Sequence, residues 1–218
     1  MTLITAKWNL DDYHQMIESG LLEDRSLELI NGEIIQMSPE GVSHSFYCRG
    51  TAKYLRSILG DRSEISEAHP ITLPNNSEPE PDIAILRTPD TLYQNRHPLP
   101  ADIFWPIEIA NTTLSKDLGV KRDLYAQAEI LEYWVMNLQT LELVVFRDLV
   151  DDSYRLEICL DSGVISPLAV PDISITSGRL LLRQTLRYRQ RCLTLVSLIL
   201  LPILISGICH RYHPSNNR

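Results

Sequence analysis

Two acidic residues and one lysine stand in an order that could carry out phosphodiester chemistry. Asp82 follows a proline and opens the apolar run of residues 83–86, and Glu108 lies inside a second apolar run at residues 103–109. Such runs predict buried strands, in which an unpaired carboxylate is costly. Each acid therefore needs a neighbouring cation, or its pKa must rise until the group is protonated. Considered alone, Asp82 also fits a turn residue after a proline.

A divalent cation shared by the two acids would neutralise both. Mg²⁺ takes carboxylate and carbonyl oxygens as ligands, and it lowers the pKa of the water that attacks a phosphate. Lys121 follows Glu108 by thirteen residues on a predicted helix, from which its ammonium group could stabilise the charged transition state. Asp82, Glu108 and Lys121 together predict a metal-dependent site that cleaves phosphodiesters.

Glu28 and His44 are two further candidate site residues. Glu28 alternates with Leu27 and Leu29 in a short strand, so it faces away from these leucines, either toward the metal and its water or toward solvent. His44 stands in the first turn of a predicted helix, where the helix dipole favours a neutral imidazole. It could contact phosphate or support the metal site, and it equally fits a surface residue.

Helical spacing predicts two more features. Asp117 precedes Lys121 by four residues, so an ion pair is expected that either aims the lysine or only stabilises the helix. Arg49, Lys53 and Arg56 are spaced four and three apart and form a basic stripe on another helix. This stripe is either a solvated helix face or a contact for phosphate.

The elements that must position these residues alternate between strands and helices. Their order predicts an α/β fold with a central mixed β-sheet flanked by helices, preceded by an N-terminal β-hairpin whose turn is Asn31-Gly32. The predicted strands lie at residues 27–30 and 33–37, around Ile65, Ile71, Ile83 and Ile107, and at residues 132–137, 141–147 and 154–160. The predicted helices begin at Asn9 or Asp11, at Ser43, and at Thr113 or Ser115.

A series of short motifs resembles the Uma2 family (DUF820), a branch of the PD-(D/E)XK nuclease superfamily that is abundant in cyanobacteria and is described as restriction endonucleases. The resemblance covers about residues 8–175, and the order of the motifs makes it specific. The matching residues are Leu27 to Glu33, Met37-Ser38-Pro39 with His44, Glu78 to Asp82, Glu108-Ile109-Ala110 with Asp117, Lys121 and Tyr125, and Glu132-Tyr133-Trp134.

The resemblance implies a restriction-endonuclease-like core, DNA as the substrate and Mg²⁺ as the cofactor. It assigns the metal to the carboxylates of Asp82 and Glu108 and the main-chain carbonyl of Ile109. The superfamily's E-x-K is here Glu108-Ile109-Ala110, so the lysine comes from the following helix. Many nucleases of this fold act as dimers, which makes a homodimer one expectation.

Two observations favour a different class of function, an inactive nuclease-fold module that binds or supports other molecules. Glu129 stands where the family has a glycine, and a glutamate resists the positive φ that glycine accepts at a helix end. In addition, residues 179–218 hold seven arginines and no acid, which leaves 13 basic against 28 acidic residues in residues 1–178. An acidic body is unfavourable for approach to a polyanion.

The length of 218 residues predicts one domain, which we place at residues 1–177, followed by a tail at residues 178–218. The four cysteines show no metal-ligand spacing and the N-terminus has no apolar signal segment, so we expect a cytoplasmic protein with reduced thiols. In the tail, residues 192–209 are uncharged and follow several arginines. The tail is therefore a membrane anchor, a buried or disordered appendage, or the product of an altered reading frame, and a membrane is a partner only in the first case.

Overall fold

The computed structural model describes residues 5–182 of the chain. Its centre is a six-stranded sheet in the order β3-β4-β5-β6-β7-β8. Only β5 and β6 of these strands run parallel, and the other neighbours are antiparallel, so the predicted mixed sheet is confirmed. The strands are β3 (Glu64–Glu67), β4 (Ile83–Leu86), β5 (Ile103–Ala110), β6 (Tyr133–Asn137), β7 (Glu142–Val150) and β8 (Ser153–Leu160).

A helical segment connects the parallel strands β5 and β6, because parallel neighbours cannot be joined by a tight turn. It consists of α3 (Leu114–Lys116), the π-helical turn η4 (Asp117–Lys121) and α4 (Arg122–Gln127). This crossover starts where β5 ends, so it brings the end of η4 back to the strand that carries Glu108.

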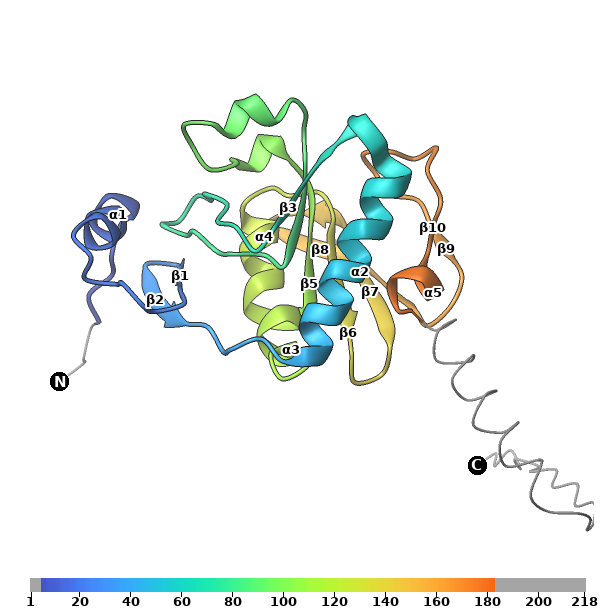
Figure 1. Ribbon diagram of the computed structural model, residues 1–218, viewed down its shortest axis with the longest axis horizontal. Coiled ribbons are helices and arrows are strands. Elements are labelled where there is room, and N and C mark those ends of the chain that lie inside the picture. The colour runs from blue at the N-terminus through green and yellow to red at the C-terminus, as the bar shows by residue number, and fades with distance from the viewer. Residues whose placement is uncertain (1–4, 183–218) are drawn as a thin grey trace, which may run out of the picture. The chain divides into compact units, whose positions relative to one another are not determined.

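The sheet has one apolar core on each face, because successive strand residues point to opposite faces. Helix α2 (Val42–Leu59) covers one face and packs against Ile107 and Ile109 of β5. Helix α4 covers the other face through Leu124 and Tyr125. Figure 1 shows the strands between α2 and α4. Since Ile107 and Ile109 face α2, the intervening Glu108 must face the crossover helix.

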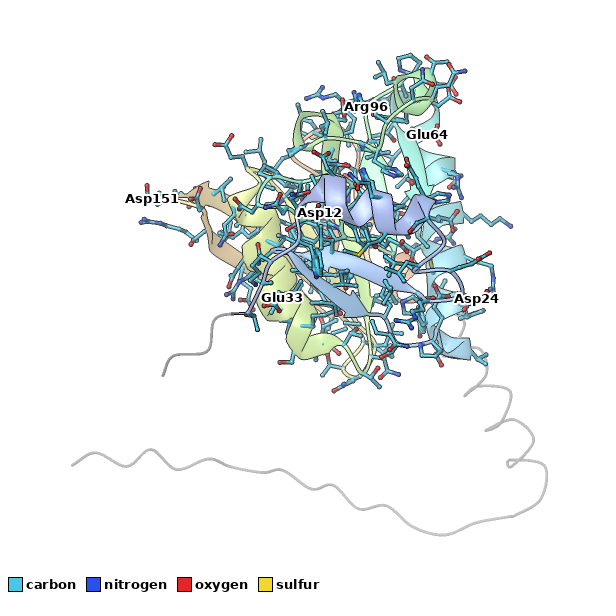
Figure 2. All side chains as sticks on the ribbon, turned by 90° about the vertical axis from the view of Figure 1, so that its left-hand side faces the viewer. Asp12, Asp24, Glu33, Glu64, Arg96 and Asp151 are labelled. Atoms are coloured by element: carbon cyan, nitrogen blue, oxygen red, sulfur yellow. The ribbon has the colours of Figure 1, made fainter. Side chains whose placement is uncertain are left out.

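The N-terminal elements form a small unit of their own beside the sheet. They are α1 (Leu10–Glu18), β1 (Leu27–Ile30) and β2 (Glu33–Gln36). The Tyr13 hydroxyl donates to the Leu27 carbonyl at 3.1 Å, and Figure 2 shows α1 lying along the hairpin. Asn31 and Gly32 have φ values of 51° and 75°, as the predicted two-residue turn requires.

Two predictions about element positions are wrong. Ile71 lies in an irregular buried segment and not in a strand. Prolines at positions 70, 74, 79 and 81 surround this stretch and lack the N–H groups that a ladder needs. Its described residues therefore form only two isolated bridges, between Leu73 and Ser77 and between Glu78 and Leu29. Helix α2 begins at Val42 with Gly41 as its N-cap, one residue before Ser43.

The described part of the chain ends in short elements that pack on α2. Leu180 and Leu181 are buried in the same core as α2, and a side-chain atom of Leu182 would lie 3.2 Å from a Cβ added at Gly50. These elements are β9 (Val164–Ile165), β10 (Ile175–Thr176) and α5 (Ser177–Leu180). Three short helical turns lie earlier in the chain, namely η1 (Gly60–Arg62), η2 (Asp90–Tyr93) and η3 (Pro100–Asp102).

The chain divides into two compact units, Met1–Arg183 and Gln184–Arg218. The predicted domain boundary at residue 177 is not tested by this division and stays a prediction. The three interpretations of the tail, namely a membrane anchor, a buried or disordered appendage and an altered reading frame, concern residues outside the described part of the chain and also stay predictions. Between residues 5 and 182, no helix is long and apolar enough to cross a membrane.

Candidate active site

A cleft of about 480 Å³ opens where β4 and β5 meet α2 and η4. Four of the five predicted site side chains line it, together with the proposed third metal ligand. These lining residues are His44, Asp82, Glu108, Ile109 and Lys121. The fifth predicted residue, Glu28, lies behind the two lysines of the cleft and is fully buried.

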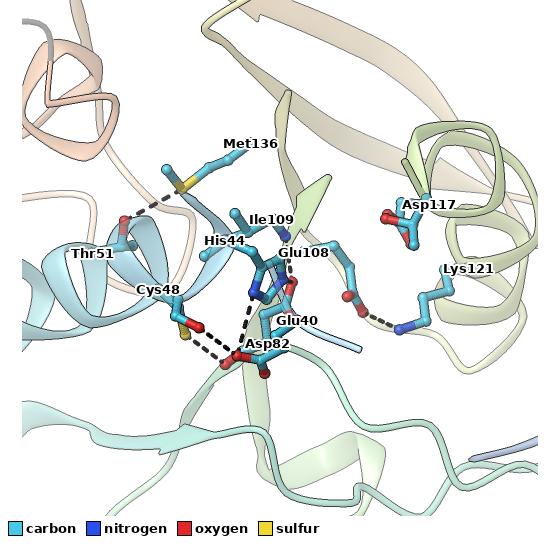
Figure 3. Close-up of polar contacts among 12 residues, drawn as sticks. Glu40, His44, Cys48, Thr51, Asp82, Glu108, Ile109, Asp117, Lys121 and Met136 are labelled. Atoms are coloured by element: carbon cyan, nitrogen blue, oxygen red, sulfur yellow. Dashed lines mark hydrogen bonds and ion pairs between the residues drawn. The ribbon is translucent and has the colours of Figure 1, made fainter. Parts of the chain in front are cut away.

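Asp82 stands immediately before β4 and links two parts of the cleft (Figure 3). Its Oδ2 accepts a hydrogen bond from the main-chain N–H of Ile109 at 2.6 Å and lies 3.0 Å from Nε2 of His44. The other oxygen, Oδ1, accepts no hydrogen bond from the described residues, so it remains available to a ligand.

Pro81 explains why the ladder between β4 and β5 opens at this point. The register pairs Ile83 with Ile107, and its continuation places Pro81 opposite Ile109. A proline has no N–H, so it cannot donate to the Ile109 carbonyl as another residue in an antiparallel pair would. The Ile109 carbonyl is thereby left without its ladder donor, while the Ile109 N–H donates to the carboxylate of Asp82.

Glu108 and Lys121 meet on the face of the sheet that the crossover helix covers. Glu108 Oε1 accepts hydrogen bonds from Lys121 Nζ and from the Tyr125 hydroxyl, each at 2.8 Å. Burial raises the pKa of the Glu108 carboxyl, and the neighbouring ammonium opposes this shift. Burial would lower the pKa of Lys121, but Glu108 and Glu28 raise it above its ordinary value. The lysine is the cation that a buried carboxylate requires.

Glu28 is a buried partner of the lysines and not a solvent-side residue. Its Oε1 accepts from Lys116 Nζ at 2.8 Å, and its Oε2 lies 3.4 Å from Lys121 Nζ. Burial alone would raise the pKa of the Glu28 carboxyl, but Lys121 and Lys116 lower it below its usual range. The N-terminal hairpin thus supplies the negative charge that holds both lysines at the cleft.

The predicted ion pair between Asp117 and Lys121 does not form. Lys121 pairs with Glu28 and Glu108, while Asp117 accepts a hydrogen bond from the Thr113 hydroxyl at 2.6 Å. The prediction assumed α-helical spacing, whereas this turn is π-helical, and π segments are frequent at functional sites. Burial also raises the pKa of Asp117.

His44 lies within the first turn of α2, as predicted, and faces Asp82. The hydrogen bond to Asp82 raises the pKa of the imidazole, although burial lowers it. Glu40, which the sequence analysis did not select, lies 3.7 Å from Nδ1 of His44. Its position four residues before the histidine is the signal that could have identified it.

The basic stripe on α2 does not border the cleft. Arg56 donates to Glu67 at 2.6 Å and to the Ile65 carbonyl, so it fastens α2 to β3. Arg49 and Lys53 are exposed and line no part of the cleft. A phosphate contact by these two residues stays a prediction.

The donor atoms at the cleft fit Mg²⁺ by their chemistry. Asp82 Oδ1 and Glu108 Oε2 accept no hydrogen bond from the described residues, and the Ile109 carbonyl lacks its ladder donor. All three are oxygens, and a hard cation prefers two carboxylates and a carbonyl to nitrogen or sulfur ligands.

Comparisons with known proteins place this geometry in context. Residues 10–195 match the profile of the Uma2 family, which is described as "Putative restriction endonuclease". A solved structure from Anabaena variabilis ATCC 29413, described as "a putative nuclease belonging to DUF820", matches with a TM-score of 0.62 and 16% sequence identity. The match covers 79% of this chain and 97% of that chain, and at this identity it shows the fold alone. No curated protein matches the chain.

Proposed function

The chain belongs to the Uma2 family, and from that premise we propose that it is a Mg²⁺-dependent endonuclease that hydrolyses phosphodiester bonds in DNA. The family and the fold of the solved neighbour support a nuclease function in general. The observation that carries the more specific proposal is the meeting of Asp82, Glu108 and Lys121 at one cleft.

Mg²⁺ would be held by the carboxylates of Asp82 and Glu108 and by the Ile109 carbonyl, where it would polarise the phosphate and acidify the attacking water. In the hydrolysis, the water oxygen attacks phosphorus, the ester P–O bond breaks and the alcohol leaves. Negative charge grows on the phosphoryl oxygens as this happens. Lys121 stabilises that charge from a fixed position, because Glu28 and Glu108 hold its ammonium group in place.

The charge of the cleft supports a requirement for bound cations. Its lining holds five carboxylates but only two lysines, so a DNA phosphate would be repelled from the metal-free cleft. The lining acids are Glu40, Glu80, Asp82, Glu108 and Asp117, and the lysines are Lys116 and Lys121.

Nicking of supercoiled plasmid tests the proposal. We expect the full chain to nick the plasmid with Mg²⁺ and to lose this activity when the metal is chelated. Asp82→Ala and Glu108→Gln should each abolish nicking and reduce the heat of Mg²⁺ binding in calorimetry. His97→Gln is a matched control, since His97 is exposed and does not line the cleft.

An inactive nuclease-fold module is the alternative, and the acidic body favours it. Such a module would give no nicking under any divalent cation. Unchanged Mg²⁺ binding in both the Asp82→Ala and the Glu108→Gln variant would show that the assigned metal site is wrong.

A further inference from the structure

The outer face of α2 carries a line of exposed side chains that begins at the cleft. Its members are spaced four, three and four residues apart, so they lie on one face of the helix, which covers one side of the sheet (Figure 1). Their positions extend over about 16 Å of helix at 1.5 Å per residue. These residues, the α2 track, are Val42, Phe46, Arg49 and Lys53.

The two ends of the α2 track differ in chemistry. Val42 lines the cleft and is 89% exposed, and Phe46 is 50% exposed. Arg49 and Lys53 are also exposed but lie outside the cleft. The track therefore leads from the cleft, past two apolar side chains, to two positive charges on the surface.

The charge of α2 indicates an anionic partner. Most lysines and arginines of the described chain face an acid, as Arg56 faces Glu67, whereas Arg49 and Lys53 form no ion pair or hydrogen bond with another described residue. None of the 18 residues of α2 is acidic, although acids outnumber bases in the body of the chain. Such a local positive stripe attracts a polyanion that the rest of the body repels.

Phe46 indicates which form of polyanion fits. An exposed aromatic ring beside basic side chains is the arrangement on which proteins stack the bases of single-stranded nucleic acids. A T-shaped contact with Tyr47, with the ring centroids 5.7 Å apart, positions the Phe46 ring, half of which stays exposed. In a duplex, neighbouring base pairs already cover both faces of each base, so only an unpaired base can stack on this ring.

We propose that the α2 track binds single-stranded DNA and guides it into the cleft. A base stacks on Phe46, while Arg49 and Lys53 contact phosphates farther along the strand. From Phe46 the strand passes Val42 and enters the cleft. This role rests on the proposed function for DNA as the substrate and makes an unpaired strand the form that is bound.

Fluorescence anisotropy of a labelled oligothymidine with the full chain tests the track. A chelator in the buffer prevents cleavage, so the measurement reports binding alone. We expect Phe46→Ala to weaken binding of the single strand about tenfold or more, and Phe46→Trp to bind at least as tightly as the wild type, because any aromatic ring can stack on a base. The double variant Arg49→Gln/Lys53→Gln should reduce the slope of the logarithm of affinity against the logarithm of salt concentration by about 1.4, as loss of two phosphate contacts on a single strand does.

Two matched variants serve as controls. Trp8→Ala removes another aromatic side chain that is 42% exposed, and Lys7→Gln/Arg155→Gln removes two positive charges from exposed ion pairs elsewhere on the surface. Both should bind the single strand as the wild type does, and circular dichroism should show that every variant is folded. The seven arginines of residues 179–218 are common to all these proteins, so their contribution cancels in the comparison.

Several results would overturn the track. They are no binding of the single strand, equal affinity of the wild type and Phe46→Ala, an equal loss in Phe46→Ala for the matching duplex, and an unchanged salt slope in the Arg49→Gln/Lys53→Gln variant. Plasmid nicking with Mg²⁺ separates this outcome from the proposed function. Nicking by a wild type whose binding does not depend on the track leaves the nuclease standing and removes the track, whereas track-dependent binding without nicking does the reverse.

Discussion

Lys121 and Lys116 both reach the cleft, but their surroundings give them different roles. Lys121 is buried and pairs with two carboxylates, whereas Lys116 is about a quarter exposed and pairs with Glu28 alone. A charge acts most strongly on a transition state when it is fixed and desolvated. Lys121 therefore fits the catalytic role proposed above better than Lys116, which neutralises Glu28.

Lys121→Met should lower the nicking rate by roughly 10² or more, with Mg²⁺ affinity nearly unchanged. It should also destabilise the metal-free protein by roughly 3–5 kcal/mol, because Glu108 would keep a buried charge without its partner. Lys116→Met is the matched comparison. It should lower the nicking rate and the stability less than Lys121→Met does, since Lys121 still faces Glu28. Nicking rates, calorimetry and urea unfolding measure the three effects. A Lys121→Met enzyme with a near-normal rate would transfer the catalytic role to Lys116.

The sequence identified Asp82 and Glu108 because a carboxylate at the start of an apolar run or inside one needs a partner, and it identified Lys121 because this residue follows Glu108 on a predicted helix. The burial of Glu28 could not be predicted from the sequence, since a four-residue strand with an alternating pattern usually has one solvent-exposed face. The opposite face of this strand is covered by the crossover helix, a contact between positions 28 and 116 that no local pattern encodes. Contacts over such separations depend on the assembled fold.

At the scale of elements, the end of α4 explains how the chain accommodates Glu129 where the family has glycine. Glu129 adopts a φ of 59°, and its N–H donates to Ala126, while the Ile130 N–H donates to Tyr125. These two bonds are the pattern of a Schellman motif, with Glu129 at the left-handed position. Glu129 thus keeps the left-handed backbone conformation that a glycine would adopt, although this conformation is unfavourable for a residue with a side chain.

Glu129→Gly should raise the free energy of unfolding by about 1 kcal/mol. A left-handed φ costs an L-residue roughly 1–2 kcal/mol, and glycine removes this strain, but glycine also loses more backbone entropy on folding, which offsets part of the gain. Glu129 is exposed, so the change removes no packing. Glu129→Ala is the control, since alanine loses the carboxylate but keeps the strain. Urea unfolding of the three proteins is the measurement. An equal gain from alanine and glycine would attribute the effect to charge and not to backbone conformation.

At the scale of the whole molecule, buried packing continues past the predicted boundary at residue 177. The change in composition after residue 177 suggests a boundary there, but α5 buries Leu180 and Leu181 against the core of α2. The family match continues to residue 195. Composition alone does not reveal that Leu180 and Leu181 pack on α2, because the segment that begins at Arg179 is uniformly basic and leucine-rich.

A chain that ends at Leu182 should therefore fold cooperatively and keep the Mg²⁺-dependent nicking of the full chain. A chain that ends at Ser177 loses Leu180 and Leu181, whose burial contributes roughly 3–6 kcal/mol together. This is a large fraction of the roughly 5–15 kcal/mol that stabilises a typical domain. Urea unfolding should accordingly show a lower midpoint for the Ser177 chain, and Leu195 provides a third end point that includes the whole family match. Equal midpoints for the Ser177 and Leu182 chains would show that α5 adds nothing to the core, and a stable fold only in the chain ending at Leu195 would assign part of residues 183–195 to the body.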